Sequence, residues 1–346
     1  MKKIKNSKDC FKSKNGVYII AEIGGNHEGN FEYAQELTRL AAESGADAIK
    51  YQIYSGDTLV NPVISPDRNK HFKKFELDID EYINLAKLCD ELDVSFMASI
   101  WDEDSIDLID DFIEIYKIGS GDMADYRMLK SIAAKKKPII LSTGLATIDE
   151  VLKSIDFIRS CDESFIDEKK LALLQCTSMY PIPDEDTNLN AMVTLREATG
   201  LPVGYSDHTV GSRAVEIAAA MGAAILEVHF TDSREGKSFR DHHVSFTAAE
   251  IRELIDKIVE MDVFRGGYEK KPVRSEIESG HLDSFRRAVY PAKDIAKGTV
   301  ISEEHLTTLR PNRGIDARNY FDLVGKKIKI DLKKYQQLEK DYFENI

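Results

Sequence analysis

Two short stretches of the sequence each place a histidine at the end of an apolar run. His208 lies in Gly204-Tyr-Ser-Asp-His-Thr-Val-Gly211, and His229 lies in Ile225-Leu-Glu-Val-His-Phe-Thr231. If the two runs are neighbouring parallel strands, both imidazoles emerge at the same edge of a sheet. Two neutral imidazoles could bind a divalent metal ion there and leave coordination positions for water and substrate. The alternative is a pair of core histidines that are only hydrogen-bonded.

Lysines stand at the ends of two other apolar runs. Lys50 and Lys117 would be costly to bury unless a carboxylate or another anion met them. One interpretation is an internal ion pair, for example with Glu22. The other is a site for a doubly anionic ligand, with phosphate and carboxylate as the obvious anions. Three serines near adjacent strand ends favour the second interpretation: Ser120, Ser142 and Ser178.

Eight apolar runs alternate with eight segments of helical periodicity. The predicted strands span residues 17–23, 46–52, 94–99, 113–118, 138–142, 171–176, 202–205 and 224–230. The predicted helices span residues 31–43, 80–92, 104–111, 126–134, 148–160, 188–198, 212–221 and 248–263. Eight strand–helix units over about 250 residues are typical of a (β/α)8 TIM barrel. Such a barrel carries its chemistry at the carboxyl ends of the strands, which is where the histidines, lysines and serines fall.

An open, doubly wound sheet is the structural alternative. That fold commonly uses fewer strands and places a glycine-rich phosphate turn after the first strand. Here the turn reads Gly24-Gly-Asn-His-Glu-Gly29, which does not match G-x-G-x-x-G. The barrel is therefore the predicted fold.

The barrel pattern ends near residue 263. Residues 264–284 read as a linker that contains Arg265-Gly-Gly-Tyr-Glu-Lys-Lys-Pro272, and residues 285–346 predict brief strands and turns. We expect a catalytic domain over residues 1–263, a linker over 264–284 and a small second module over 285–346. A module of that size is marginal alone.

The composition argues against several classes of function. The 346 residues carry a formal net charge of −13, with 60 acidic and 47 basic side chains, whereas binding to a nucleic-acid backbone needs clustered Lys and Arg. No apolar run approaches the roughly 20 residues of a membrane helix, and charged residues follow the basic N-terminus where a signal peptide would be apolar. The four cysteines form no C-x-x-C pair. We expect a cytoplasmic protein without a nucleic-acid or membrane partner.

Seven short motifs occur along the chain in a fixed order. They are Ala21-Glu-Ile-Gly-Gly-Asn-His27, Ile49-Lys-Tyr-Gln52, Tyr116-Lys-Ile-Gly-Ser-Gly-Asp122, Ile140-Leu-Ser-Thr-Gly144, Cys176-Thr-Ser-Met-Tyr-Pro181, Ser206-Asp-His-Thr209 and Glu227-Val-His-Phe-Thr231. Together they resemble the sialic acid synthase family, whose members condense phosphoenolpyruvate with an N-acylated hexose to make nine-carbon 2-keto acids. The resemblance covers nearly the whole chain. The C-terminal module, with Leu309-Arg-Pro311, resembles the antifreeze-like (SAF) domain of that family.

The resemblance implies a role for each matching residue. Phosphoenolpyruvate would bind Lys50, Lys117, Ser99, Ser120, Ser142 and Ser206, with Ser178 where the family can have a phosphate-contacting asparagine. His208 and His229 would bind Mn2+ or Mg2+, and this ion would polarise the aldehyde of the sugar. Glu22 would lie near the reacting carbons as a proton acceptor or as a stabiliser of positive charge at C2. The sugar side would be lined by Asp122, Tyr180 and Asp241, and Arg310 would reach in from the other subunit of a homodimer.

The sequence departs from the family pattern mainly on the sugar side. It reads Ala98-Ser-Ile-Trp101 where Ser-Thr-Pro-Phe is usual, and Asp122 replaces a common glutamate. Gln175 stands where a histidine often precedes the cysteine. The acceptor therefore need not be N-acetylmannosamine. A bis-acetamido trideoxyhexose, which would lead to a legionaminic-like or pseudaminic-like acid, is the other candidate.

Two further functions fit the same residues. A Schiff-base aldolase would use Lys50 or Lys117 as its nucleophile on the same barrel and would need no metal. A non-catalytic carbohydrate-binding or regulatory protein could have kept the fold after losing its chemistry. Because Glu22 is present together with the two lysines and the two histidines, we favour the synthase.

Overall fold

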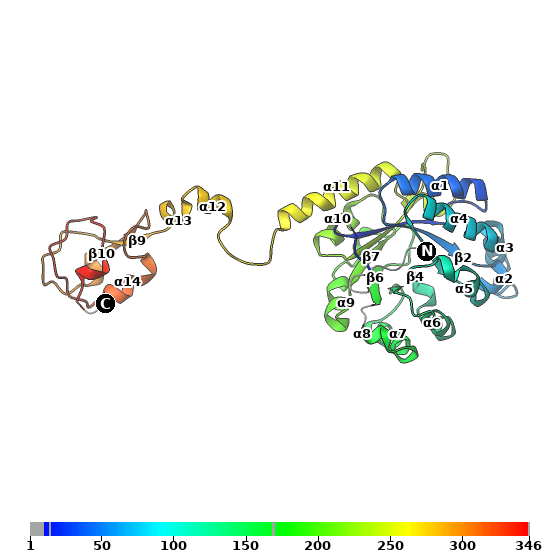
Figure 1. Cartoon of the computed structure of the whole chain (residues 1–346), viewed down its shortest axis with the longest axis horizontal. Coiled ribbons are helices and arrows are strands. Elements are labelled where there is room, and N and C mark those ends of the chain that lie inside the picture. Colours follow the sequence, from blue (N-terminus) through cyan, green and yellow to red (C-terminus); the bar gives the residue numbers. More distant parts are fainter. Residues whose placement is uncertain (1–9, 14, 168–169, 345–346) are drawn as a thin grey trace. The chain divides into compact units, whose positions relative to one another are not determined.

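The computed structural model describes residues 10–13, 15–167 and 170–344 of the chain (Figure 1). Its internal contacts divide the chain into two compact units, with the boundary in the sequence between Gly266 and Gly267.

The N-terminal unit is a closed barrel of parallel strands, which confirms the predicted (β/α)8 fold. Its strands are β1 (Tyr18–Gly24), β2 (Ala48–Ile53), β3 (Ser95–Ile100), β4 (Tyr116–Ile118), β5 (Ile139–Ser142), β6 (Leu171–Cys176), β7 (Val203–Asp207) and β8 (Ile225–His229). Strand β1 pairs with both β2 and β8 and so closes the barrel.

Helices surround these strands (Figure 1). They are α1 (Phe31–Glu43), α4 (Ile79–Glu91), α5 (Glu103–Ile109), α6 (Tyr126–Ala133), α7 (Ile148–Cys161), α9 (Ala191–Thr199), α10 (Arg213–Ala220) and α11 (Ala248–Arg265). Local sequence explains several of their starts: Thr147 and Glu150 form a capping box on α7, and Thr247 and Glu250 form one on α11.

The structure differs from the predicted elements in several places. Strand β4 begins only at Tyr116, because the chain leaves the 3-10 turn η1 (Asp110–Phe112) and bends at Glu114 and Ile115 before it becomes extended. Residues between β2 and α4, for which no element is predicted, form α2 (Gly56–Leu59) and α3 (Pro66–Phe75). Helix α3 is mostly polar, and so its periodicity is weak; the signals of its start are Ser65 at the N-cap, followed by Pro66 and Asp67 in the first turn. A further short helix is α8 (Ser164–Asp167).

Two apolar layers hold the barrel together. Alternate strand residues such as Ile19, Ala21 and Ile23 of β1 face the helices, whereas Tyr18 and Ile20 face the barrel interior. The interior cluster is Tyr18, Ile20, Ala48, Met97, Ile115, Ile140, Ala172, Leu174 and Ile225. This alternation decides which side chain of each strand points into the barrel at its carboxyl end.

The C-terminal unit has its own small core. Its elements are α12 (Arg274–Glu278), α13 (His281–Ser284), β9 (Ala288–Pro291), β10 (Leu306–Leu309) and α14 (Tyr320–Leu323), with β9 and β10 antiparallel. The core residues are Val289, Ile295, Ile301, Leu306, Ile315, Leu323, Ile328, Leu332, Leu338 and Phe343. Helices α12 and α13 fall within residues 264–284, the predicted linker.

In the described parts of both units, no helix combines the length and the apolar character that a membrane span requires.

Candidate active site

A layer of polar side chains fills the inside of the barrel at the carboxyl ends of its strands. It consists of Glu22, Lys50, Ser99, Lys117, Ser142, Ser206 and Glu227, all of them buried. All of these residues except Ser206 stand two positions after a residue of the interior cluster, as Glu22 follows Ile20 and Lys50 follows Ala48. Strand alternation therefore continues the apolar interior into this polar layer.

Carboxylates and lysines alternate within the polar layer. The Nζ atom of Lys50 lies 2.6 Å from Glu22 Oε2 and 3.8 Å from Glu227 Oε2. The Nζ atom of Lys117 lies 3.6 Å from Glu227 Oε1. Lys50 thus has the internal partner that the ion-pair interpretation names, and Glu227, which the sequence does not single out as a site residue, joins the two lysines. Gln52 also reaches the site and donates from Nε2 to Glu22 Oε1 at 2.8 Å.

The two buried lysines differ in their proton affinity. Burial lowers the pKa of Lys50, but the charges of Glu22 and Glu227 outweigh burial and leave the pKa raised. For Lys117 burial prevails over the charge of Glu227, and its pKa is lowered. An additional anion beside Lys117 would stabilise its charged form, so this lysine gains most from an anionic ligand.

Serine hydroxyls surround the lysines as predicted. Lys117 Nζ donates to Ser142 Oγ at 2.7 Å, and Lys50 Nζ donates to Ser99 Oγ at 3.4 Å. Gly144 marks where two more hydroxyls meet. A Cβ atom there would lie 2.7 Å from Ser178 Oγ and 2.8 Å from Ser120 Oγ, so a larger residue would displace these hydroxyls. Hydroxyls and ammonium groups together form the kind of surface that binds phosphate or carboxylate.

The two predicted histidines lie next to each other at the ends of β7 and β8. Their ring centroids are 5.3 Å apart, and both side chains are buried. His208 Nδ1 lies 3.0 Å from the carbonyl oxygen of Thr177, which can only accept a hydrogen bond. The proton is therefore on Nδ1, and the lone pair of Nε2 is free. Burial and the neighbouring His229 lower the pKa of His208 to about 3, so its ring is neutral at physiological pH.

These histidines fit a metal ion as two of its ligands. His229 Nδ1 is buried and has no hydrogen-bond partner in the described part of the chain, which is costly unless a ligand uses it. Neutral imidazoles are the form that binds divalent metals. Within residues 10–13, 15–167 and 170–344, no three His, Cys, Asp or Glu side chains converge on one point. An ion here would take its remaining ligands from water or substrate.

Tyr180 packs against the two histidines, and the guanidinium group of Arg240 lies over its ring. Its centroid is 3.9 Å from that of His208 and 5.7 Å from that of His229. The Arg240 guanidinium lies 4.3 Å from the Tyr180 centroid, and its Nε donates to Asp241 Oδ1 at 2.9 Å. The structure thus brings Tyr180 and Asp241 to the same side of the site, as the sequence predicts. Arg240 is an addition that no sequence motif indicates.

Asp122 lies beyond the end of β4, in the 3-10 turn η2 (Ser120–Asp122). Burial raises the pKa of its carboxyl group to about 6, although the charge of Lys117 acts in the opposite direction. The indole N–H of Trp101 also favours the ionised form, but its geometry falls short of a hydrogen bond. Asp122 is therefore near the point of changing its charge at physiological pH.

Replacing Asp122 with asparagine should stabilise the protein at alkaline pH. The raised pKa means that the folded chain holds this proton more tightly than the unfolded chain, so the contribution of Asp122 to stability is lost as pH rises through about 6. We expect Asp122→Asn to raise the free energy of unfolding by about 1–3 kcal/mol at pH 8 and by almost nothing at pH 4. Urea titrations at both pH values measure this, with the exposed Asp111→Asn as the matched control. An equal effect at both pH values would contradict the assignment.

Arg310 belongs to the C-terminal unit, where its guanidinium lies 5.1 Å from the centroid of the Phe285 ring. Its side chain is exposed. The remaining predicted site residues all belong to the barrel unit.

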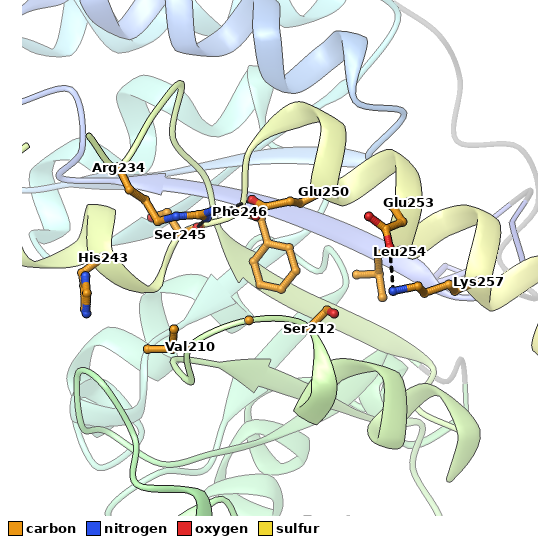
Figure 2. Close-up of a pocket in the computed structure, with 11 residues that line it drawn as sticks. Val210, Ser212, Arg234, His243, Ser245, Phe246, Glu250, Glu253, Leu254 and Lys257 are labelled. Atoms are coloured by element: carbon orange, nitrogen blue, oxygen red, sulfur yellow. Dashed lines mark hydrogen bonds and ion pairs between the residues drawn. The ribbon is translucent and has the colours of Figure 1, made fainter. Parts of the chain in front are cut away.

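A separate cavity of about 250 Å³ lies among the loops after β7 and β8 and helix α11 (Figure 2). Its charged lining groups are paired with each other: Arg234 forms a bidentate ion pair with Glu250, and Lys257 Nζ lies 2.8 Å from Glu253 Oε1. None of the predicted site residues lines this cavity.

Comparisons with known proteins agree with the site. Residues 37–270 match the NeuB family, and residues 286–343 match the SAF domain. The chain is 37% identical to an N,N'-diacetyllegionaminic acid synthase of Legionella pneumophila over 91% of each chain. It is 31% identical to a pseudaminic acid synthase of Campylobacter jejuni, over 96% of this chain and 98% of that one.

A solved structure extends the similarity to three dimensions. The N-acetylneuraminic acid (sialic acid) synthetase of Leptospira borgpetersenii, solved with citrate, superimposes with a TM-score of 0.71 at 29% identity, over 77% of this chain and 90% of that one. The family match covers most of the barrel, and the second match covers most of the C-terminal unit. On these grounds the chain belongs to the NeuB family.

Proposed function

We propose that the protein condenses phosphoenolpyruvate with an N-acylated amino sugar and forms a nonulosonic acid and phosphate. The observation that carries this proposal is the polar layer, in which two buried lysines and several serine hydroxyls converge beside a pair of buried histidines. The relatives named as legionaminic, pseudaminic and sialic acid synthases support the same reaction.

The polar layer suits the charges of phosphoenolpyruvate. This substrate carries a phosphate and a carboxylate on a small carbon frame. These two anionic groups can replace the internal carboxylate partners of Lys50 and Lys117. Lys117 also holds Ser142 at 2.7 Å, so an anion that meets its ammonium group meets a hydroxyl as well. We assign Lys50, Lys117, Ser99, Ser142 and Ser206 to phosphoenolpyruvate.

The reaction balances with water as the third substrate. C3 of phosphoenolpyruvate forms a bond to the aldehyde carbon of the open-chain sugar, which leaves an oxocarbenium-like centre at C2. Water adds to C2, and the bond between C2 and the phosphate oxygen breaks. One proton of the water goes to the former aldehyde oxygen and the other leaves with phosphate, so that a 2-keto acid remains.

Glu22 is the group placed to stabilise positive charge and accept a proton in this reaction. It pairs in register with Lys50 on one side and with His229 on the other, so it lies between the proposed phosphoenolpyruvate and metal positions. As a carboxylate it can stabilise the cationic C2 and accept a proton from the water that attacks it. Gln52 holds one of its oxygens and fixes its orientation.

We assign His208 and His229 to a divalent ion, Mn2+ or Mg2+. When bound, the ion would supply Lewis-acid polarisation of the acceptor's aldehyde. The hydrogen bond from His208 Nδ1 to the carbonyl oxygen of Thr177 orients that ring, and the Tyr180 ring packs against His208 and covers it.

For the acceptor we propose a bis-acetamido trideoxyhexose. The relative with 37% identity is named for diacetyllegionaminic acid, and the altered residues Trp101 and Asp122 set this chain apart on the sugar side. The test is phosphate release from phosphoenolpyruvate with Mn2+, across N-acetylmannosamine and the 2,4-diacetamido-2,4,6-trideoxyhexoses, with and without EDTA. We expect the highest kcat/KM with a diacetamido sugar and no release with EDTA. Preference for N-acetylmannosamine would overturn the acceptor assignment, and full activity in EDTA would overturn the metal.

A Schiff-base aldolase remains the second candidate because of one observation, the lowered pKa of Lys117. Borohydride added with pyruvate would trap such an enzyme on this lysine. The synthase proposal predicts no trapped adduct.

We further propose a homodimer in which the C-terminal unit of each chain covers the barrel of the other. Exposed apolar side chains on the loops after β2, β5, β6 and β7 support a cover: Val63, Ile64, Leu145, Met179 and Val210. Leu145 is 81% exposed and has a φ of 67°, a left-handed conformation that is unfavourable for leucine. An apolar residue held in that conformation in water is better explained by a partner that packs on it.

Arg310→Ala tests this arrangement. Because Arg310 would contact the acceptor, we expect the KM of the sugar to rise at least about 10-fold while the KM of phosphoenolpyruvate stays within about twofold. Mixed dimers give the sharper measurement. Dimers that combine an Arg310→Ala chain with a Lys117→Met chain should recover activity, since the intact barrel then receives an intact Arg310. Failure of mixed dimers to recover, with each chain dimeric and folded, would contradict the exchange.

A further inference from the structure

Trp101 carries a buried indole N–H just after β3, at the carboxyl end of the barrel. The residue follows β3 directly, and its backbone N–H donates to the carbonyl oxygen of Ile53 at 2.9 Å, which fixes its position. Its ring stacks on Tyr54 with centroids 5.3 Å apart and planes 26° apart. The Nε1 atom is buried and has no hydrogen-bond partner in the described part of the chain. A buried indole N–H normally finds a partner, so this one is placed for a ligand.

The Asp122 carboxylate lies close to this indole N–H. A Cβ atom on Gly119 would lie 2.8 Å from Asp122 Oδ2 and 3.6 Å from Trp101 Nε1. Both polar atoms therefore lie beside the backbone of Gly119, and a side chain at this position would collide with the Asp122 carboxylate. We call the place bordered by Trp101, Gly119 and Asp122 the notch; it presents one donor from Trp101 and one acceptor from Asp122, with the stack of Trp101 on Tyr54 beside them.

This notch adjoins the polar layer. Trp101 stands two positions after Ser99, and Ser99 pairs in register with Lys117. Asp122 is close enough to Lys117 to feel its charge. A ligand in the notch would therefore lie at the β3 and β4 side of the phosphoenolpyruvate position.

A secondary amide has the complementary chemistry. Its carbonyl oxygen accepts one hydrogen bond, its N–H donates another, and its acyl methyl group is apolar. We propose that Trp101 and Asp122 bind an acylamino group of the acceptor sugar, with the indole N–H donating to the amide oxygen and the Asp122 carboxylate accepting from the amide N–H. This inference rests on the proposed function and names two residues that would select its acceptor.

Trp101 is the only tryptophan in the sequence, so its indole N–H gives a single signal in a ¹⁵N-labelled protein. Without phosphoenolpyruvate, a diacetamido trideoxyhexose should shift that signal. Analogues with one acetamido group replaced by hydroxyl identify the group concerned, because the analogue that lacks the correct amide should shift it much less. An indole signal that stays unmoved at saturating acceptor would overturn the proposal.

Kinetics of Trp101→Phe provide the second readout. Phenylalanine keeps the aromatic stack but removes the donor. We expect the preference for the diacetamido acceptor over the hydroxyl analogue, measured as a ratio of kcat/KM, to fall about 10-fold, with the KM of phosphoenolpyruvate unchanged. Phe72→Leu is the matched control. Phe72 packs edge-on against Tyr54, with centroids 5.3 Å apart, so this change loosens the same aromatic cluster and should leave the preference intact.

The outcomes separate this inference from the proposed function. If the parent protein releases phosphate in an acceptor-dependent way but Trp101→Phe keeps the full preference, the notch assignment is wrong and the synthase stands. If the parent releases no phosphate with any of these sugars, the proposed function fails, and the notch assignment fails with it.

Discussion

Lys117→Met should lower kcat/KM for phosphate release by about 10²–10⁴-fold, corresponding to the loss of about 3–5 kcal/mol of interaction with a buried anion. Methionine fills most of the lysine volume but carries no charge. The substitution removes the ammonium group that contacts Ser142 and lies 3.6 Å from Glu227. Affinity for phosphoenolpyruvate, measured by calorimetry, should fall with it, because this is the lysine that gains most from an added anion.

Two comparisons make this result specific. Lys153→Met changes an exposed lysine of α7 and should leave both kcat/KM and the affinity for phosphoenolpyruvate unchanged. Because Lys117 is buried, the unfolding midpoint of Lys117→Met must also be measured, to separate a lost ligand contact from a lost fold. If Lys117→Met folds and keeps the parental affinity for phosphoenolpyruvate, the polar layer does not bind this substrate.

His229→Ala should weaken Mn2+ binding by about 100-fold or more, because two protein ligands are reduced to one. The fold should survive, since His229 Nδ1 makes no hydrogen bond within the described residues that the substitution could break. Paramagnetic relaxation of water by bound Mn2+ measures the affinity directly and needs no substrate. Phosphate release should fall in parallel.

His243→Ala is the matched control for this prediction. His243 lies in the loop after β8, so it is near the carboxyl end of the barrel like His229. Unlike His229, its side chain is exposed. Its removal should leave Mn2+ affinity unchanged. Equal Mn2+ affinity in the parent and in His229→Ala would show that the ion binds elsewhere.

Much of the site could be predicted from sequence because it is built on strands. In a parallel barrel the alternation of side chains is fixed, so a lysine that ends an apolar run, such as Lys50 or Lys117, must point into the interior or into the helices. The outward choice would bury it among apolar residues such as Ile49 and Tyr116 with no partner. The same argument brought the two histidines of β7 and β8 to one edge.

Interactions that depend on loops could not be predicted in this way. Arg240 lies over Tyr180 because the 3-10 turn η4 (Arg240–Val244) takes one particular path, and no periodicity encodes that path. Glu227 was not predicted as a site residue for a different reason. Its sequence neighbourhood points to His229, whereas its partners Lys50 and Lys117 lie on strands far away in the chain.

The unused indole nitrogen of Trp101 illustrates a third limit. Sequence comparison shows only that a tryptophan replaces the usual residue after β3. Only the three-dimensional structure shows that its indole N–H is buried, lies next to Asp122 at the backbone of Gly119, and makes no hydrogen bond within the described residues.

The most direct test of the central claim is a mass balance in one reaction mixture that contains phosphoenolpyruvate, a diacetamido trideoxyhexose and Mn2+. Phosphoenolpyruvate consumed, phosphate released and 2-keto acid formed are each measured over time. A condensing synthase predicts equal amounts of all three, with none formed when the sugar is omitted. Unchanged phosphoenolpyruvate in the presence of every acylamino sugar tested, or consumption of pyruvate in its place, would contradict the claim.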